Sequence, residues 1–186
     1  MTSSEHVELV RSGPAGERRD GQPERLLGID LGDRRIGVAV ADLRSGAVTP
    51  LTTFRRARRV ADDAVVVARL AAEQRTGLVV VGLPLDMDGT EGLQAGKTRD
   101  WATAIEAATS LPIRYRDERL SSVRAEERLG SAGRGASGGP PSAARREAYR
   151  ARIDREAAAV ILQDEIDAMA RGAARTTPGP NQGSDE

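Results

Sequence analysis

The sequence predicts an α/β fold, a mixed sheet of five strands with helices packed on its faces. Strand-like and helical segments follow one another in the order β-β-β-α-β-α-β-α-loop-α. The run Leu78–Leu83 is wholly apolar, which is typical of a buried parallel strand. A three-strand meander followed by βα units favours a sheet that contains both antiparallel and parallel pairs.

The first half of the chain supplies three strands and a helix. Two apolar runs within Arg25–Asp42, separated by a short polar turn, predict a hairpin. A third strand is expected near Val48–Phe54. Residues 59–75 carry apolar side chains at helical spacing and precede the strand Leu78–Leu83.

The second half alternates loops, helices and one further strand. The expected segments are a loop at Pro84–Gly92, a helix at Leu93–Thr109, a strand at Pro112–Arg116, a helix from about Ser122 to Leu129, and a last helix over 143–170. The folded domain is therefore expected at 25–171. Residues 1–24 and 172–186 are expected to be disordered tails. Residues 131–142 hold four glycines and two prolines and are expected to form a flexible loop.

The composition excludes several classes of chemistry. The chain of 186 residues has no cysteine, so it can form neither a disulfide nor a thiolate metal site. Its only histidine lies in the polar N-terminal stretch, which argues against a histidine-based catalytic triad. No apolar run approaches the roughly 18 residues that span a bilayer, and no signal peptide is evident. We expect a cytoplasmic protein without a membrane partner. The formal net charge of zero argues against a long-range basic field.

Asp30 is the most informative residue. Side chains alternate along a strand, so Asp30 points to the opposite side from Ile29 and Leu31. A carboxylate within an apolar strand is costly unless something pairs with it. The flanking residues Gly28 and Gly32 leave room for a cation and a phosphate. The alternative to a functional role is that Asp30 simply ends the strand and caps the next turn.

Two further carboxylates are candidates. Glu118 follows the strand at Pro112–Arg116, and ligands collect at the carboxyl ends of strands in βα units. The alternative is that Glu118 merely belongs to a charged strand-to-helix connection, in which a serine caps the next helix. Asp154 shares a face of the last helix with alanines, so it is expected to point inward as a functional residue. The alternative is that it pairs at the surface with Arg150, one turn earlier. Three carboxylates without His or Cys suit Mg²⁺ or Mn²⁺, ions that can promote phosphodiester hydrolysis.

Four blocks of sequence resemble the YqgF family, also called RuvX, whose members are Holliday junction resolvase-like proteins now regarded as pre-16S rRNA nucleases. The blocks are GIDLGDRRIGVA at 28–39, VVGLPLDMDGTEG at 80–92, DERLSS at 117–122 and IDREAAAVILQ at 153–163. They occur in the family's order. The resemblance implies an RNase H-like fold, a five-stranded mixed sheet with helices on both sides, and it implies that Asp30, Glu118 and Asp154 form the catalytic metal site.

Several residues near these carboxylates are candidates for binding substrate. They are Arg34, Arg35, Arg119, Ser121, Ser122, Gly89, Arg146, Tyr149 and Arg150. Arginine suits phosphate, and an arginine beside an aromatic ring suits single-stranded RNA, although a solvated helix face with a half-buried tyrosine explains Arg146–Arg150 equally well. The arginines at 55, 56, 58 and 59 are read as solvated surface.

The leading hypothesis is a Mg²⁺- or Mn²⁺-dependent nuclease that processes the 5′ end of pre-16S rRNA, acting as a monomer or weak homodimer. One alternative is a Holliday junction resolvase acting on branched DNA, which normally needs a dimer. Another is a nucleic-acid-binding factor without catalysis. An actin-like ATPase is disfavoured because the chain is too short for a second lobe.

Overall fold

The computed structural model describes residues 23–130 and 141–176. Within these ranges the elements are β1 (Arg25–Leu31), β2 (Arg35–Asp42), β3 (Ala47–Arg55), α1 (Val60–Gln74), β4 (Leu78–Leu83), α2 (Leu93–Thr109), β5 (Ile113–Asp117), α3 (Ser121–Leu129) and α4 (Ala143–Thr176). The tails expected at 1–24 and 172–186 and the loop expected at 131–142 lie for the most part outside the described residues.

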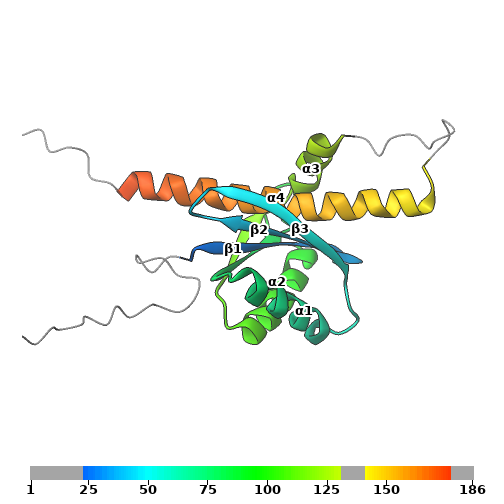
Figure 1. The fold of residues 1–186 in the computed structure, drawn as a ribbon, viewed down its shortest axis with the longest axis horizontal. Helices are drawn as coiled ribbons and strands as arrows, with labels where there is room; N and C mark the ends of the chain where they lie inside the picture. Colours follow the sequence, from blue (N-terminus) through cyan, green and yellow to red (C-terminus); the bar gives the residue numbers. More distant parts are fainter. Residues whose placement is uncertain (1–22, 131–140, 177–186) are drawn as a thin grey trace, which may run out of the picture.

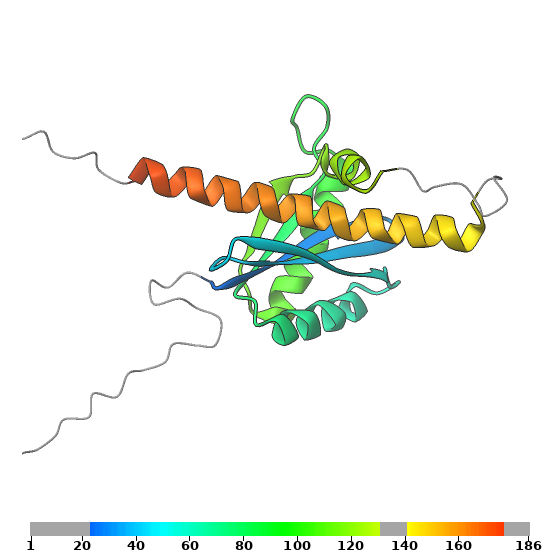
Figure 2. The ribbon, with the colours of Figure 1, turned by 45° about the horizontal axis from the view of Figure 1, so that its top comes forward.

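The five strands form one mixed sheet in the order β3-β2-β1-β4-β5. The pairs β1–β2 and β2–β3 are antiparallel, and the pairs β1–β4 and β4–β5 are parallel. Helices α1 and α2 cover one face, and the long helix α4 crosses the other face with α3 packed beside it (Figures 1 and 2). The predicted fold class, a five-stranded mixed sheet with helices on both faces, is confirmed.

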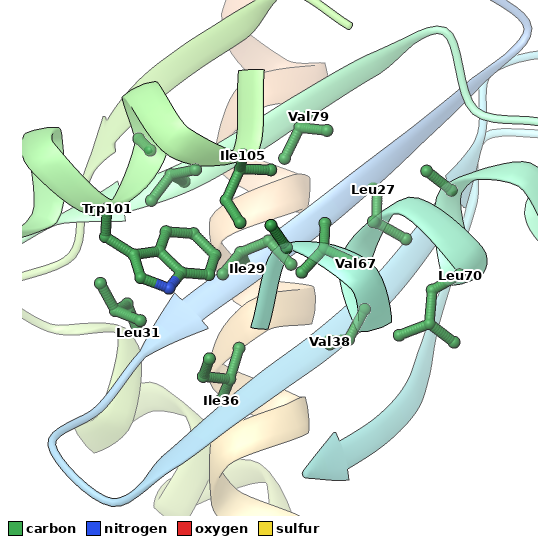
Figure 3. Close-up of a cluster of buried hydrophobic side chains, with 14 residues drawn as sticks. Leu27, Ile29, Leu31, Ile36, Val38, Val67, Leu70, Val79, Trp101 and Ile105 are labelled. Carbon is green, nitrogen blue, oxygen red and sulfur yellow. The ribbon is translucent and has the colours of Figure 1, made fainter. Parts of the chain in front are cut away.

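The face toward α1 and α2 holds the larger apolar core. Leu27, Ile29 and Leu31 alternate out of β1 into this core, together with residues of β2 and β4 (Figure 3). Trp101 of α2 is 1% exposed, and its indole Nε1 donates a hydrogen bond of 3.1 Å to the buried carboxylate of Asp63. That bond satisfies a polar group which would otherwise be costly to bury.

The face toward α4 is built to let a helix lie close to the strands. Leu26 and Val80 pack there against Ala158, Ile161 and Leu162 of α4. A Cβ atom at Gly28 would lie 2.4 Å from Leu162 Cγ, so only a glycine fits the close approach of the helix at that point. The side chains that leave β1 on this face therefore end directly beneath α4.

Helix α4 continues to Thr176, so the expectation that the helix ends at 170 and that a tail begins at 172 was wrong. Alanine and arginine at 173–175 favour helix, and the first proline that would stop it comes only at 178. Among helices of the described ranges, none combines the length and the apolar character that crossing a bilayer requires.

Candidate active site

Asp30 emerges from β1 beneath α4, with a glycine beside it on each neighbouring strand. Gly37 is its direct partner on β2. On the other side Ile29 pairs with Val81, so continuing the parallel register by one residue places Gly82 beside Asp30. The carboxylate thus lies in a row of the sheet where its two neighbours have no side chains.

The two glycines admit the other two predicted carboxylate residues. A Cβ atom at Gly37 would lie 2.0 Å from the backbone carbonyl oxygen of Asp154, so α4 rests directly on this strand. A Cβ atom at Gly82 would lie 2.1 Å from Oε2 of Glu118, so this carboxylate occupies the space above β4. Asp154 and Glu118 therefore flank Asp30 from opposite sides.

The electrostatics reflect this crowding of negative charge. Burial, together with the charges on Glu118 and Asp154, raises the pKa of Asp30 to about 8. Burial, with a contribution from the charge on Asp117, raises the pKa of Glu118 to about 7. The Oε2 atom of Glu118 is buried and has no hydrogen-bond partner among the described residues.

Asp154 is paired with Arg35 of β2. The guanidinium Nε donates to Asp154 Oδ2 at 2.5 Å, and Nη1 of the same arginine contacts Glu147 Oε1 at 3.1 Å. The alternative pairing of Asp154 with Arg150 is not formed, since no contact joins these two side chains in the structure. Arg35 thus supplies the cation that Asp154 faces here.

The donor set fits a hard divalent cation. The pKa of Asp30 is raised first by burial and then by the negative charges of Glu118 and Asp154, and Glu118 Oε2 is an acceptor without a donor among the described residues. Both features are those of oxygen ligands suited to Mg²⁺ or Mn²⁺. Among the side chains of residues 23–130 and 141–172, however, no three acidic or histidine groups are arranged as a ready-made cage, and Asp154 would have to exchange Arg35 for the ion.

The raised pKa values predict how the stability of the cation-free protein depends on pH. The pKa of Asp30 rises from 3.8 to about 8, and that of Glu118 from 4.5 to about 7. Over this window the folded chain binds more protons than the unfolded chain, so the free energy of unfolding falls as pH rises, by up to about 1.4 kcal/mol per pH unit for each proton.

Thermal unfolding in EDTA at several pH values between about 5.5 and 8.5 measures this effect. We expect a higher melting temperature at the lower pH and a weaker dependence in Glu118→Gln. Millimolar Mg²⁺ should restore stability at the higher pH, because the ion binds the ionised carboxylates. A melting temperature that rises with pH in EDTA would contradict the assignment.

Three of the arginines predicted to bind substrate lie together. Arg34, Arg35 and Arg150 line a cavity that also reaches Asp154. Arg119 lies on the other side, next to Glu118 in the chain, where its guanidinium contacts Asp117 at 2.7 Å and the carbonyl of Met87 at 3.3 Å. These placements are compatible with phosphate contacts on both sides of the carboxylates.

The loop between β4 and α2 carries Gly89 at its tip. This residue is exposed and has a φ of +86°, which favours glycine. Its amide donates to the carbonyl of Asp86 at 2.8 Å within the loop. That backbone N–H is therefore occupied, and a phosphate contact at Gly89 stays a prediction.

The serines after Glu118 do not cap α3 as the alternative for this segment suggested. Helix α3 begins at Ser121 with Leu120 in the cap position and no side-chain cap. The buried Ser121 hydroxyl instead donates to the carbonyl of Glu118 at 3.0 Å and so fixes the backbone of that residue. Ser122 is exposed and has no such contact among the described residues.

Tyr149 packs between α3 and α4 against Ala125 and Ile153, and its hydroxyl donates to the carbonyl of Gly130. Arg146, one turn earlier, is exposed and donates to the carbonyl of Pro141 at 2.5 Å. For Tyr149 the geometry favours the half-buried structural role over base stacking. A substrate role for Arg146 stays a prediction.

Arg55 and Arg56 were missed as members of a site. Both line a cavity together with Arg34, Arg35 and Arg150, which the reading as solvated surface did not foresee. Arg55 is exposed, in agreement with that reading. The signal was present in the hairpin register, because Arg55 is the direct partner of Arg35 across β2 and β3.

The chain matches a family profile described as "RuvX: Holliday junction resolvase" over residues 24–168. A relative from Anaeromyxobacter dehalogenans strain 2CP-1 is 45% identical over 146 residues, covering 78% of this chain and 98% of the relative. A relative from a Synechococcus species is 43% identical over 141 residues, covering 76% of this chain and 87% of the relative. Both relatives bear the name "Putative pre-16S rRNA nuclease".

A solved structure of RuvC from Thermus thermophilus, in complex with a Holliday junction substrate, aligns with 95% of its chain and 78% of this one, at 15% identity and a TM-score of 0.46. A further structure of Thermus thermophilus RuvC aligns at 14% identity and a TM-score of 0.48. The sequence relatives and the family profile carry the assignment. The chain belongs to the RuvX family, also called YqgF, and is a nuclease.

Proposed function

We propose that this chain is a divalent-cation-dependent nuclease that processes the 5′ end of pre-16S rRNA, with Asp30, Glu118 and Asp154 as its catalytic residues. The observation that carries the proposal is the convergence of Glu118 and Asp154 on the buried carboxylate of Asp30. Burial, and then the charges of these two carboxylates, raise the pKa of Asp30, and Glu118 has a buried oxygen without a donor among the described residues. Two of the relatives bear the name of a pre-16S rRNA nuclease, which supports this substrate, and rRNA processing would place the reaction in the cytoplasm.

The proposed mechanism assigns a separate task to each group. Asp30, Glu118 and Asp154 would hold Mg²⁺ or Mn²⁺, which would supply Lewis-acid stabilisation of the phosphate and a more acidic water. Gly37 and Gly82 leave the space beside Asp30 that the Asp154 backbone and the Glu118 carboxylate occupy. Ser121 fixes the Glu118 backbone through its carbonyl. Water adds to phosphorus as one phosphodiester P–O bond breaks; the water gives up a proton to solvent and the leaving oxygen takes one up, so the products are a phosphate monoester and a hydroxyl end. Arg34 and Arg150 hold the substrate backbone next to the reacting phosphate.

Arg35 has a positioning role in this proposal. Its guanidinium holds the Asp154 carboxylate at 2.5 Å and links it to Glu147, two turns earlier in α4. A charge-assisted contact of this kind fixes the side chain against β2. When Asp154 turns to the cation, the same guanidinium becomes available to a substrate phosphate.

A substrate comparison tests the function. Purified protein is incubated with Mg²⁺ and, in parallel, with a precursor-type rRNA carrying a 5′ extension and with a four-way DNA junction. We expect the wild type to cleave the RNA, and we expect EDTA to abolish this cleavage. In Glu118→Gln the cleavage rate should fall on the order of 100-fold. The control is Asp100→Asn, an exposed carboxylate on α2, which should cleave like the wild type.

The other outcomes identify the alternatives. Mg²⁺-dependent cleavage of the junction but not of the RNA would favour a Holliday junction resolvase, a possibility that the family description supports. Binding of RNA without cleavage under all cation conditions would favour a non-catalytic factor. Sedimentation of the active species decides between the proposed monomer and a weak homodimer.

A further inference from the structure

Five arginines surround one cavity at the end of the β2–β3 hairpin, beside the carboxylate site. The cavity has a volume of about 410 Å³, and its cations are Arg34, Arg35, Arg55, Arg56 and Arg150. Two carboxylates, Asp33 and Glu147, also line it. The whole chain has a formal net charge of zero, so this excess of positive charge is a local feature of the fold.

Most of this positive charge is not neutralised by ion pairs. Arg35 contacts Asp154 and Glu147. The Arg56 guanidinium reaches only a backbone carbonyl, that of Gly32, at 3.5 Å. The other three arginines form no ion pair within the described ranges; these are Arg34, Arg55 and Arg150.

The strand register forces two of these charges together. Arg35 and Arg55 are direct partners across β2 and β3, so their side chains leave the same face of the sheet, toward α4. Like charges directly opposite one another on adjacent strands are unfavourable. Arg150 approaches from α4 on the same side. An anion held between these side chains would relieve the repulsion.

The cavity is continuous with the surroundings of the carboxylates. A second cavity of about 370 Å³ is lined by Asp33, Arg34, Arg35 and Arg150, as the first one is, and it extends to Gly32 and Asp154. A strand of nucleic acid whose reacting phosphate lies at Asp30 and Asp154 would therefore run toward the arginines. Within the described part of the chain no aromatic side chain lines either cavity, so the site is suited to phosphate and not to base stacking.

We propose that this arginine cavity, formed by Arg34, Arg55, Arg56 and Arg150 around Arg35, binds a phosphate group of the nucleic-acid substrate away from the phosphate that is cleaved. The inference rests on the proposed nuclease function and adds where the substrate backbone lies. Guanidinium groups bind phosphate oxygens in bidentate geometry, and several of them converge here from two strands and a helix. The contact is independent of base sequence.

Binding measured without catalysis tests the proposal. Fluorescence anisotropy of a single-stranded RNA is recorded in EDTA at several salt concentrations for the wild type, Arg55→Gln and Arg150→Gln. We expect each variant to weaken binding about 5- to 10-fold, and the slope of log K against log salt to fall by about 0.7 for each lost contact to a single strand. The matched control is Arg44→Gln, an exposed arginine at the other end of the same hairpin.

Two sources of the phosphate are separated by the choice of RNA. An equal loss of affinity with 5′-phosphorylated and 5′-hydroxyl RNA identifies an internal diester, whereas a loss confined to the phosphorylated RNA identifies a terminal phosphate. Either result supports the cavity as a phosphate site. Wild-type affinity and salt slope in both Arg55→Gln and Arg150→Gln would overturn it. This result is distinct from failure of the nuclease function, which would appear as absent cleavage by the wild type.

Discussion

Asp30→Asn is expected to reduce RNA cleavage by roughly 10³-fold or more and, at the same time, to stabilise the cation-free protein above neutral pH. The loss of activity follows because an amide is a poor ligand for a hard divalent cation, and Asp30 lies between the other two carboxylates. The gain in stability follows because the amide carries no charge, which at Asp30 is costly first through burial and then through repulsion by Glu118 and Asp154.

The opposite signs of the two effects make this variant informative. A residue that merely supported the fold would lose activity and stability together. Single-turnover cleavage with saturating Mg²⁺ and thermal unfolding in EDTA at pH about 8.5 measure the two effects separately. Asp100→Asn on α2 serves as the control for both measurements. Undiminished cleavage by Asp30→Asn would exclude it from the catalytic site.

Gly37→Ala is expected to destabilise the fold by about 3 kcal/mol, which corresponds to a melting temperature lower by about 6–12 °C. The added Cβ atom would lie 2.0 Å from the carbonyl oxygen and 2.9 Å from the following amide nitrogen of α4, at Asp154 and Arg155. Because these are backbone atoms, no change of rotamer can relieve the clash. The helix must move away from the sheet and take Asp154 with it.

The matched control is Gly96→Ala in α2. Apart from its chain neighbours and the nearby backbone of α2, no atom of residues 23–130 and 141–176 lies within 4 Å of a Cβ at Gly96, and the residue is exposed within a helix. We expect this variant to gain about 0.5–1 kcal/mol, because alanine loses less conformational entropy than glycine when the helix forms. Urea unfolding of both variants compares them directly. Equal stabilities would show that α4 does not rest on Gly37 as the structure has it.

The order of elements was predictable because it depends on local patterns. The apolar run Leu78–Leu83 and the helix Leu93–Thr109 have the predicted bounds. Alternation of side chains along β1 also placed Asp30 on the face opposite Ile29, and that face is the one that α4 covers. Both inferences need only the repeat of a strand or a helix, which the chain itself displays.

The contacts between distant segments were not predictable in this way. Arg35 and Asp154 are separated by 119 positions in the chain, and nothing near either residue indicates that they meet. The sequence instead suggested Arg150 as the local partner, since residues four apart on a helix are neighbours. A strand pairing and a helix crossing together decide the actual pair.

The sequence by itself determined which residues are proposed to carry the chemistry, three carboxylates and a set of arginines in a chain without cysteine, and on which elements they lie. Only the tertiary structure decided how these charges are distributed in space. The hairpin register sets Arg55 against Arg35, and the glycines on β2 and β4 allow Asp154 and Glu118 to flank Asp30. The physical reason is that side-chain periodicity is a local property, whereas register and helix crossing depend on close packing between segments far apart in the chain.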